Sequence, residues 1–170
     1  MTIHIFDNED LLEINFQDIQ KFHGTKAYAE VGVAYRMAEA AFEALYGKAV
    51  PVREDLSIVA GQACTGFRDA FEYITRAETR GKYVVDASYP MAQYDPHHSA
   101  SFAVVFSRES GEEVEVSLKK EFLPPVYFEY LKKSRDKTFT VEEEEQFELL
   151  KKELCMQALQ LPLDDVVEVR

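Results

Sequence analysis

Hydrophobic residues recur every three or four positions between residues 30 and 46, and this spacing predicts a long helix with one apolar face. The positions on that face are Val31, Ala34, Tyr35, Ala38, Ala41, Phe42 and Leu45. The opposite face carries Arg36, Glu39 and Glu43, and Gly47 follows as a residue that suits a helix C-terminus. Because several of the apolar side chains are alanines, another element can pack closely against this helix. We therefore expect the rest of the domain to be organised around it.

Further segments have helical patterns, and they span residues 16–23, 67–77, 124–134 and 140–160. Asn15 suits the N-cap of the first of these helices, and Gly24 suits its C-terminus. Thr140 and Glu143 form a capping-box pattern at the start of the last one. The acidic run 142–145 complements the dipole of that helix, so it predicts a solvated helix start rather than a metal site.

Residues 102–106 and 114–118 alternate between apolar and polar positions, which is typical of strands with one buried face. The polar turn 107–112 joins them, so the pattern predicts a β-hairpin. Short strands are also predicted at residues 56–60 and 82–87. Residues 1–14 are a polar lead-in with a few apolar positions, and the sequence leaves open whether they pair with another segment or fray. Together these elements predict an α+β fold in which an antiparallel sheet packs against helices.

Composition and charge narrow the class of protein. The chain has 170 residues, 46% of them hydrophobic and 12% aromatic, which suits one globular domain with a sizeable core. A formal net charge of -12 with no cluster of basic residues disfavours nucleic-acid binding. No apolar run is long enough for a membrane span, and the N-terminus has neither the basic start nor the apolar stretch of a signal peptide. We therefore expect a cytoplasmic protein that contacts no membrane.

Side chains that can bind a metal or a ligand come from three predicted loops: His23, Cys64 and the pair His97-His98. Histidine and cysteine are zinc ligands, although here they are scattered along the sequence. Each also has a structural interpretation, which stays open. The imidazole of His23 suits a helix C-terminus, the paired histidines suit a polar surface turn, and Cys64 suits a small buried position. Cys155 falls in a helical pattern and is expected to be buried.

Catalytic motifs are not recognisable. There is no Gly-x-Ser-x-Gly elbow, and residues 61–66 lack the Gly-Lys-Ser/Thr ending of a phosphate-binding loop. Nothing in the spacing of Ser, His and Asp residues selects a catalytic triad. The residues alone therefore assign no reaction.

The order of several short segments resembles the formylmethanofuran dehydrogenase E-subunit family, whose members carry FmdE-like domains. These segments are Phe22-His23-Gly24, residues 34–38 on the long helix, Asp69-Ala70-Phe71, Gly81-Lys82, the predicted hairpin, residues 140–144 and the tail 161–169. The resemblance covers nearly the whole chain. It implies a single domain of this family over residues 1–170, with a core at about 15–120 and C-terminal helices at about 124–160.

Members of that family typically show His-Gly-His and then Cys-Pro-Gly ahead of the long helix, residues suited to bind zinc. In this chain Thr25 takes the place of the second histidine, and residues 26–30 replace the Cys-Pro-Gly segment. Cys64 lies five residues before Asp69, where the family has three. The zinc ribbon that many longer members append does not occur here. The residues that can substitute as metal ligands beside His23 are Cys64, His97 and His98.

Three functions follow as hypotheses. The first is a stand-alone small-molecule-binding or accessory module that forms a homodimer and has its pocket near His23, Tyr28, Cys64 and His97. The second is a metal-dependent enzyme that holds zinc or a similar divalent ion with His23, Cys64, His97 and His98. The third is a structural partner of a molybdenum or tungsten enzyme complex of the formylmethanofuran dehydrogenase type. We favour the first.

Overall fold

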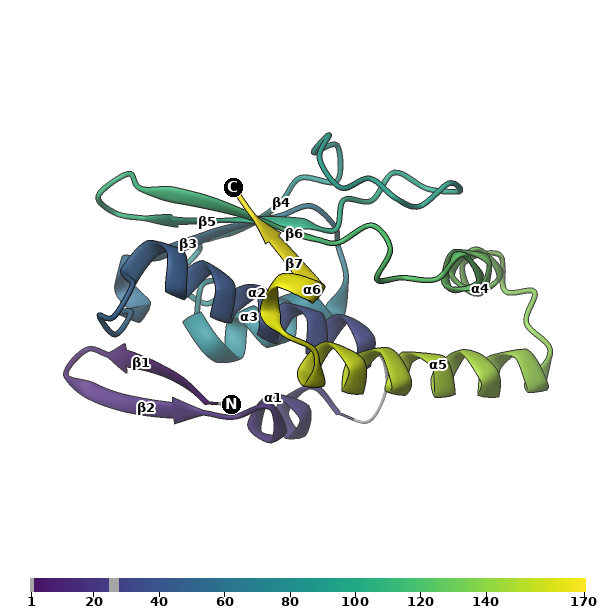
Figure 1. The fold of residues 1–170 in the computed structure, drawn as a ribbon, viewed down its shortest axis with the longest axis horizontal. Helices are drawn as coiled ribbons and strands as arrows, with labels where there is room; N and C mark the ends of the chain where they lie inside the picture. The colour runs from purple at the N-terminus through teal and green to yellow at the C-terminus, as the bar shows by residue number, and fades with distance from the viewer. Residues whose placement is uncertain (1, 25–27) are drawn as a thin grey trace.

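A mixed sheet forms one layer of the fold, with its strands in the order β4-β3-β5-β6-β7 (Figure 1). The computed structural model describes residues 2–24 and 28–170. The strands are β3 (Leu56–Ala60), β4 (Tyr83–Val85), β5 (Ala103–Arg108), β6 (Glu113–Leu118) and β7 (Val167–Val169). The α+β prediction and the predicted β5–β6 hairpin are confirmed.

The sheet departs from the predicted antiparallel pairing at β4, which runs parallel to β3. Helix α3 (Thr65–Thr75) connects these two strands, and it returns the chain to the end of the sheet from which β3 started. A crossover helix of this kind is the usual way to join parallel strands. The other pairings, from β3 to β5, β5 to β6 and β6 to β7, are antiparallel.

Helix α2 (Tyr28–Tyr46) is the central helix, as the sequence predicted, and it begins two residues earlier than expected. It lies beneath the sheet together with α3, and α5 (Val141–Gln160) packs along it (Figure 1). Helices α2 and α5 pack closely at Gly32, because a β-carbon at this position would lie 2.8 Å from the Sγ of Cys155. Cys155 is buried, as expected. Arg36, predicted for the polar face, is buried as well and donates to Glu39 and to the carbonyl of Leu161.

The first residues form a hairpin that the sequence pattern did not reveal. Strands β1 (Ile3–Asp7) and β2 (Asp10–Ile14) pair antiparallel, and with α1 (Phe16–His23) they lie on the side of α2 and α3 that faces away from the sheet (Figure 1). Buried residues in the hairpin are few, and the alternation breaks at Leu11, which is half exposed. Periodicity alone was therefore too weak to identify these strands.

The C-terminal part begins with α4 (Pro125–Asp136) and continues through α5 and α6 (Leu163–Val166) into β7. The predicted capping box is confirmed: Thr140 accepts from the backbone N–H of Glu143, whose carboxylate accepts from the N–H of Thr140. Strand β7 completes the edge of the sheet beside β6 and was not predicted. Within the part of the chain that the structure describes, none of the helices combines the length and apolar character needed to cross a membrane.

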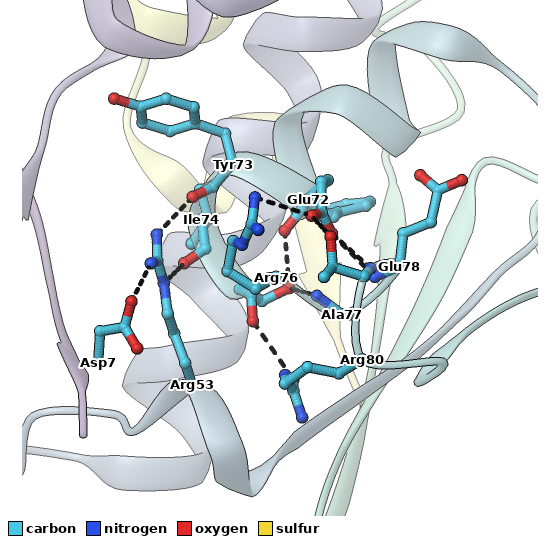
Figure 2. A network of polar contacts seen from close by, with 12 residues as sticks. Asp7, Arg53, Glu72, Tyr73, Ile74, Arg76, Ala77, Glu78 and Arg80 are labelled. Atoms are coloured by element: carbon cyan, nitrogen blue, oxygen red, sulfur yellow. Dashed lines mark hydrogen bonds and ion pairs between the residues drawn. The ribbon is translucent and has the colours of Figure 1, made fainter.

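The C-terminal end of α3 is closed by a buried arginine (Figure 2). Arg53, in the short helix η1 (Arg53–Asp55), donates from Nε to the carbonyl of Ile74 at 2.8 Å and from Nη2 to the carbonyl of Tyr73 at 2.6 Å. Its Nη1 pairs with Asp7 of β1 at 2.7 Å. One side chain therefore satisfies carbonyls at the helix end and ties them to the N-terminal hairpin.

Glu72 organises the turn that follows α3 (Figure 2). Its Oε2 accepts from the backbone N–H groups of Glu78 at 2.9 Å and Thr79 at 3.1 Å. Its Oε1 pairs with Arg76 at 3.2 Å and accepts the hydroxyl of Thr79. Both carboxylate oxygens are thus satisfied within the chain.

Candidate functional site

His23, the last residue of α1, points inward and pairs with Asp69 of α3. The Asn15 capping box starts α1, and Gly24, with a φ of 101°, ends it, as the sequence predicted. The Nδ1 of His23 lies 2.8 Å from Oδ2 of Asp69, and the two side chains are 6% and 18% exposed. Arg68 holds the other carboxylate oxygen of Asp69 at 2.9 Å. The ring of His23 is therefore fixed against the first turns of α3.

Cys64 is the N-cap of α3, where its Sγ accepts from the backbone N–H of Phe67 at 3.3 Å. Burial raises the pKa of this thiol, and the nearby carboxylate of Glu30 raises it further. At neutral pH the thiol is therefore protonated, whereas a nucleophilic cysteine needs a depressed pKa. The environment makes Cys64 a weak hydrogen-bonding group and a poor nucleophile.

Glu30 stands in the first turn of α2, close against the start of α3. A β-carbon at Gly66 would lie 2.7 Å from the β-carbon of Glu30, so the two helix ends are in direct contact. The Oε1 of Glu30 accepts the hydroxyl of Tyr127 of α4 at 2.6 Å. Its Oε2 is buried and has no hydrogen-bond partner among residues 2–24 and 28–170. Burial, followed by this carboxylate, raises the pKa of Tyr127 well above its usual range, so the phenol remains a donor.

Two more buried polar atoms lack partners in the described chain: the Nε2 of Gln62, two residues before Cys64 in the sequence, and the hydroxyl of Tyr83. Burial raises the pKa of Tyr83, and the adjacent Cys64 contributes to the shift. We call these residues the Glu30 cluster: Glu30, Gln62, Cys64, Tyr83 and Tyr127. It offers one carboxylate oxygen as an acceptor, one amide as a donor and one phenol that can act as either.

A small cavity of about 10 Å³ adjoins this cluster, lined by Glu30, Tyr127 and apolar side chains that include Leu123. That space is about enough for one water molecule. Because its remaining walls are apolar, Glu30 and Tyr127 are the residues through which the cavity meets the polar groups of the cluster.

The predicted site residues fall into two groups. His23 and Cys64 are connected through Asp69, which binds the imidazole and whose charge acts on the thiol. Tyr28 is the half-buried first residue of α2. Thr25 and the first two residues of the altered Cys-Pro-Gly region, Lys26 and Ala27, lie outside the described residues.

His97 and His98 belong to the second group, on the exposed loop before β5. The Nε2 of His97 lies 2.7 Å from the Oε1 of Glu129 on α4. Among the described residues, no three His, Cys, Asp or Glu side chains form a group that could hold a metal ion. The metal site built from His23, Cys64, His97 and His98 stays a prediction.

Sequence reasoning missed the partners that define the cluster. Asp69 was noticed only as part of a family motif, and Glu30 only as the start of a helix. A charged residue at the first turn of an otherwise apolar helix was the available signal for Glu30, but acidic residues are common there for dipole reasons. Tyr127 and Tyr83 gave no signal beyond their aromatic character.

Comparison with known families gives a match to this chain. The family model described as FmdE, molybdenum formylmethanofuran dehydrogenase operon, matches residues 22–168, which is most of the chain. No curated protein matches it. The matched region begins just before His23 and includes the whole Glu30 cluster and most of the C-terminal strand. This chain belongs to the FmdE family.

Proposed function

We propose that this chain is an accessory module of the formylmethanofuran dehydrogenase type that binds a small polar molecule at the Glu30 cluster. The observation that carries the proposal is the buried Oε2 of Glu30, which has no partner in the described chain. Family membership supports the accessory role, since the matching model is named for a formylmethanofuran dehydrogenase operon.

An unpartnered carboxylate oxygen is expensive to bury. Leaving a buried acceptor unsatisfied costs about 1–3 kcal/mol, and more when the group is charged. Native proteins leave few such groups, and those that persist call for an explanation such as a bound water, ion or ligand. Here the companion oxygen is well satisfied by Tyr127 at 2.6 Å, so the side chain is held in place with one oxygen open to a partner from outside the described chain. A ligand that donates an N–H or O–H to Oε2 removes the penalty.

The rest of the cluster narrows the ligand's chemistry. Gln62 can donate from its amide nitrogen, and Tyr83 can donate from its hydroxyl, since neither atom has a partner in the described chain. A complementary molecule therefore presents a donor to Glu30 and an acceptor to Gln62 or Tyr83. The adjacent donor and acceptor on the edge of a lactam or an amide-containing heterocycle have this pattern. Because the cavity beside Glu30 has room for about one water molecule, binding of such a ligand requires neighbouring side chains to move.

Binding fits the cluster better than nucleophilic chemistry does. The thiol of Cys64 is kept protonated by its burial and by Glu30, which raise its pKa and oppose thiolate attack. The imidazole of His23 is engaged by Asp69, with Nδ1 2.8 Å from Oδ2, and it is not part of the Glu30 cluster. We assign no reacting group.

Binding is tested by thermal-shift screening of metabolites, pterins and other amide-containing heterocycles, followed by calorimetry on the hits. A ligand present at 100 times its Kd is expected to stabilise the wild type by about 2.7 kcal/mol. Glu30→Gln replaces one of the two carboxylate oxygens with an NH₂ group and removes the negative charge. The variant is therefore expected to lose this stabilisation by the ligand. The matched control Glu43→Gln changes an exposed acid on the same helix and is expected to keep it.

The proposal fails if no compound stabilises the wild type, or if Glu30→Gln binds as tightly as Glu43→Gln. A metal-dependent function is separated by including Zn²⁺ alone in the screen and by elemental analysis of untagged protein. Stoichiometric zinc that is lost when His23 and His97 are mutated together would favour the metal hypothesis instead.

A further inference from the structure

A surface slot of about 470 Å³ lies between α4, the loop that precedes β5 and the segment that leads from β6 to α4. Its apolar walls are Tyr94, Pro96, Leu123, Pro124, Pro125 and Phe128. We call it the Tyr94 slot. Its size falls within the usual range of small-molecule sites, and its lining is rich in aromatic and proline side chains. It is separate from the Glu30 cluster, although Leu123 also lines the small cavity beside Glu30.

The walls of the slot are held by ion pairs from a single helix. The Nη2 of Arg135 on α4 lies 2.6 Å from the Oδ2 of Asp95, whose side chain is completely buried. Earlier on the same helix, Glu129 pairs with His97 at 2.7 Å. Both contacts fasten the loop to the helix, so the slot is formed before any ligand enters. Such preorganisation lowers the entropy lost on binding.

The aromatic floor favours a flat ligand. The ring of Tyr94 stacks on Phe102, with centroids 6.3 Å apart and an interplanar angle of 4°. Phe128 meets the same Phe102 ring at 74°, with centroids 6.0 Å apart. Tyr94 and Phe128 both line the slot, and their ring planes are steeply inclined to each other. Tyr94 is partly exposed whereas Phe128 is buried, so Tyr94 offers the more open ring face. A planar aromatic group can stack on one of them and meet the edge of the other, which are the preferred aromatic geometries.

The rim of the slot carries one cationic and one anionic side chain, and neither forms an ion pair with another described residue. Lys120 and Glu121 both line the slot and are exposed, and neither forms an ion pair within the described parts of the chain. The third charged residue of the lining, Glu129, is already paired with His97. Consecutive charges of opposite sign at the mouth of an aromatic slot complement a ligand whose ring carries a neighbouring carboxylate and ammonium group.

We infer that the Tyr94 slot binds an aromatic zwitterion of the α-amino acid class, with its ring against Tyr94 and Phe128, its carboxylate at Lys120 and its ammonium at Glu121. This site goes beyond the function proposed for the Glu30 cluster and does not depend on it.

The chain has no tryptophan, so an indole ligand can be followed by its own fluorescence when it is excited at the long-wavelength edge of its absorption, where the nine tyrosines absorb little. Four indole probes separate the two charges. L-tryptophan carries both the ammonium and the carboxylate, tryptamine carries the ammonium alone, indole-3-propionate carries the carboxylate alone, and indole carries neither. We expect L-tryptophan to bind most tightly. Lys120→Ala is expected to weaken L-tryptophan about fivefold and to leave tryptamine unchanged, in line with the strength of an exposed ion pair. Glu121→Gln is expected to weaken L-tryptophan about fivefold and to leave indole-3-propionate unchanged.

The matched control for the lysine is Lys132→Ala, an exposed lysine of α4 that does not line the slot, and it is expected to bind all four probes as the wild type does. Tyr94→Leu keeps the wall apolar but removes the ring face, and it is expected to weaken every probe, with circular dichroism confirming that the fold is retained. Glu30→Gln is expected to leave indole binding unchanged, so failure at one site is distinguishable from failure at the other.

The inference would be overturned if none of the four probes binds. It would also be overturned if all four bind with equal affinities that Lys120→Ala and Glu121→Gln do not alter.

Discussion

The two ends of helix α3 carry polar networks of opposite character. At the C-terminal end, the guanidinium of Arg53 donates to two backbone carbonyls and to Asp7, and all three of its nitrogens are used (Figure 2). At the N-terminal end, Glu30 uses one oxygen for Tyr127 and leaves the other buried without a partner in the described chain. A network that satisfies its own donors and acceptors stabilises the fold, whereas one that leaves them unsatisfied is able to bind something else.

The contrast is clearest between two glutamates. Glu72 satisfies both of its oxygens with the turn that follows α3, whereas within the described chain Glu30 satisfies one. Each side chain lies at an end of the same helix and is largely shielded from solvent, so the difference does not arise from burial alone. It arises from whether the chain itself supplies the missing donor.

Removing the guanidinium at the satisfied end gives the largest expected effect. Arg53→Ala leaves the carbonyls of Tyr73 and Ile74 without their donor and Asp7 without its cation, so we expect a loss of about 3–5 kcal/mol in the free energy of unfolding. Arg76→Ala, at a side chain that is 49% exposed, is the control and is expected to lose less than about 1 kcal/mol. Urea denaturation measures both. Similar losses in the two variants would remove the distinction between a buried network and a surface pair.

The same acid-to-amide change is expected to have opposite signs at the two glutamates. Glu72→Gln loses its charge and an acceptor for the turn, which we expect to destabilise the protein by about 1–2 kcal/mol. Glu30→Gln neutralises a buried carboxylate that lacks one partner in the described chain, which we expect to stabilise the free protein by about 1 kcal/mol. Thermal unfolding of both variants without ligand is the measurement. A destabilised Glu30→Gln protein would contradict the view that this end of α3 is kept for binding at the expense of stability.

The smallest expected effect concerns Asp55, whose contribution to the free energy of unfolding changes only at acidic pH. Burial raises the pKa of this carboxyl, but hydrogen bonds from Arg108, the Tyr46 hydroxyl and the Glu109 N–H outweigh it, so the net shift is downward. A lowered pKa gives stabilisation that is present above the unfolded value, near 3.9, and is lost as the pH falls through the folded value. Asp55→Asn is therefore expected to lose less stability than the wild type between about pH 6 and about pH 3, by about 1 kcal/mol or less. Urea midpoints at the two pH values test this, and an unchanged difference would show that Asp55 does not contribute.

Local sequence signals predicted most of the elements. Thr140 and Glu143 mark a helix start because each satisfies the other's backbone N–H, an interaction confined to four residues. The β5–β6 hairpin was predictable because apolar and polar positions alternate on both sides of a short turn. Strands β1, β2 and β7 were not predicted because they bury few residues. In addition, the strand that pairs with β7 lies far away in the sequence.

The candidate site was harder to predict because its pairs join distant segments. His23 was selected from its residue type, but Asp69 lies 46 residues away and only the packing of α1 on α3 brings them together. Glu30 and Tyr127 are separated by 97 residues. No local pattern can show that a carboxylate is buried with one oxygen unsatisfied, because that property depends on everything that packs around it.

The short strand β7 also affects how the protein behaves after proteolysis of its C-terminal tail. It covers the edge of β6, with Val169 opposite Val116 and Val167 opposite Leu118. If a protease clips the tail, the newly bared edge carries valine and leucine beside open backbone groups, the kind of surface on which other chains assemble into aggregates. A handful of terminal residues thus protects the sheet against becoming a template for its own precipitation.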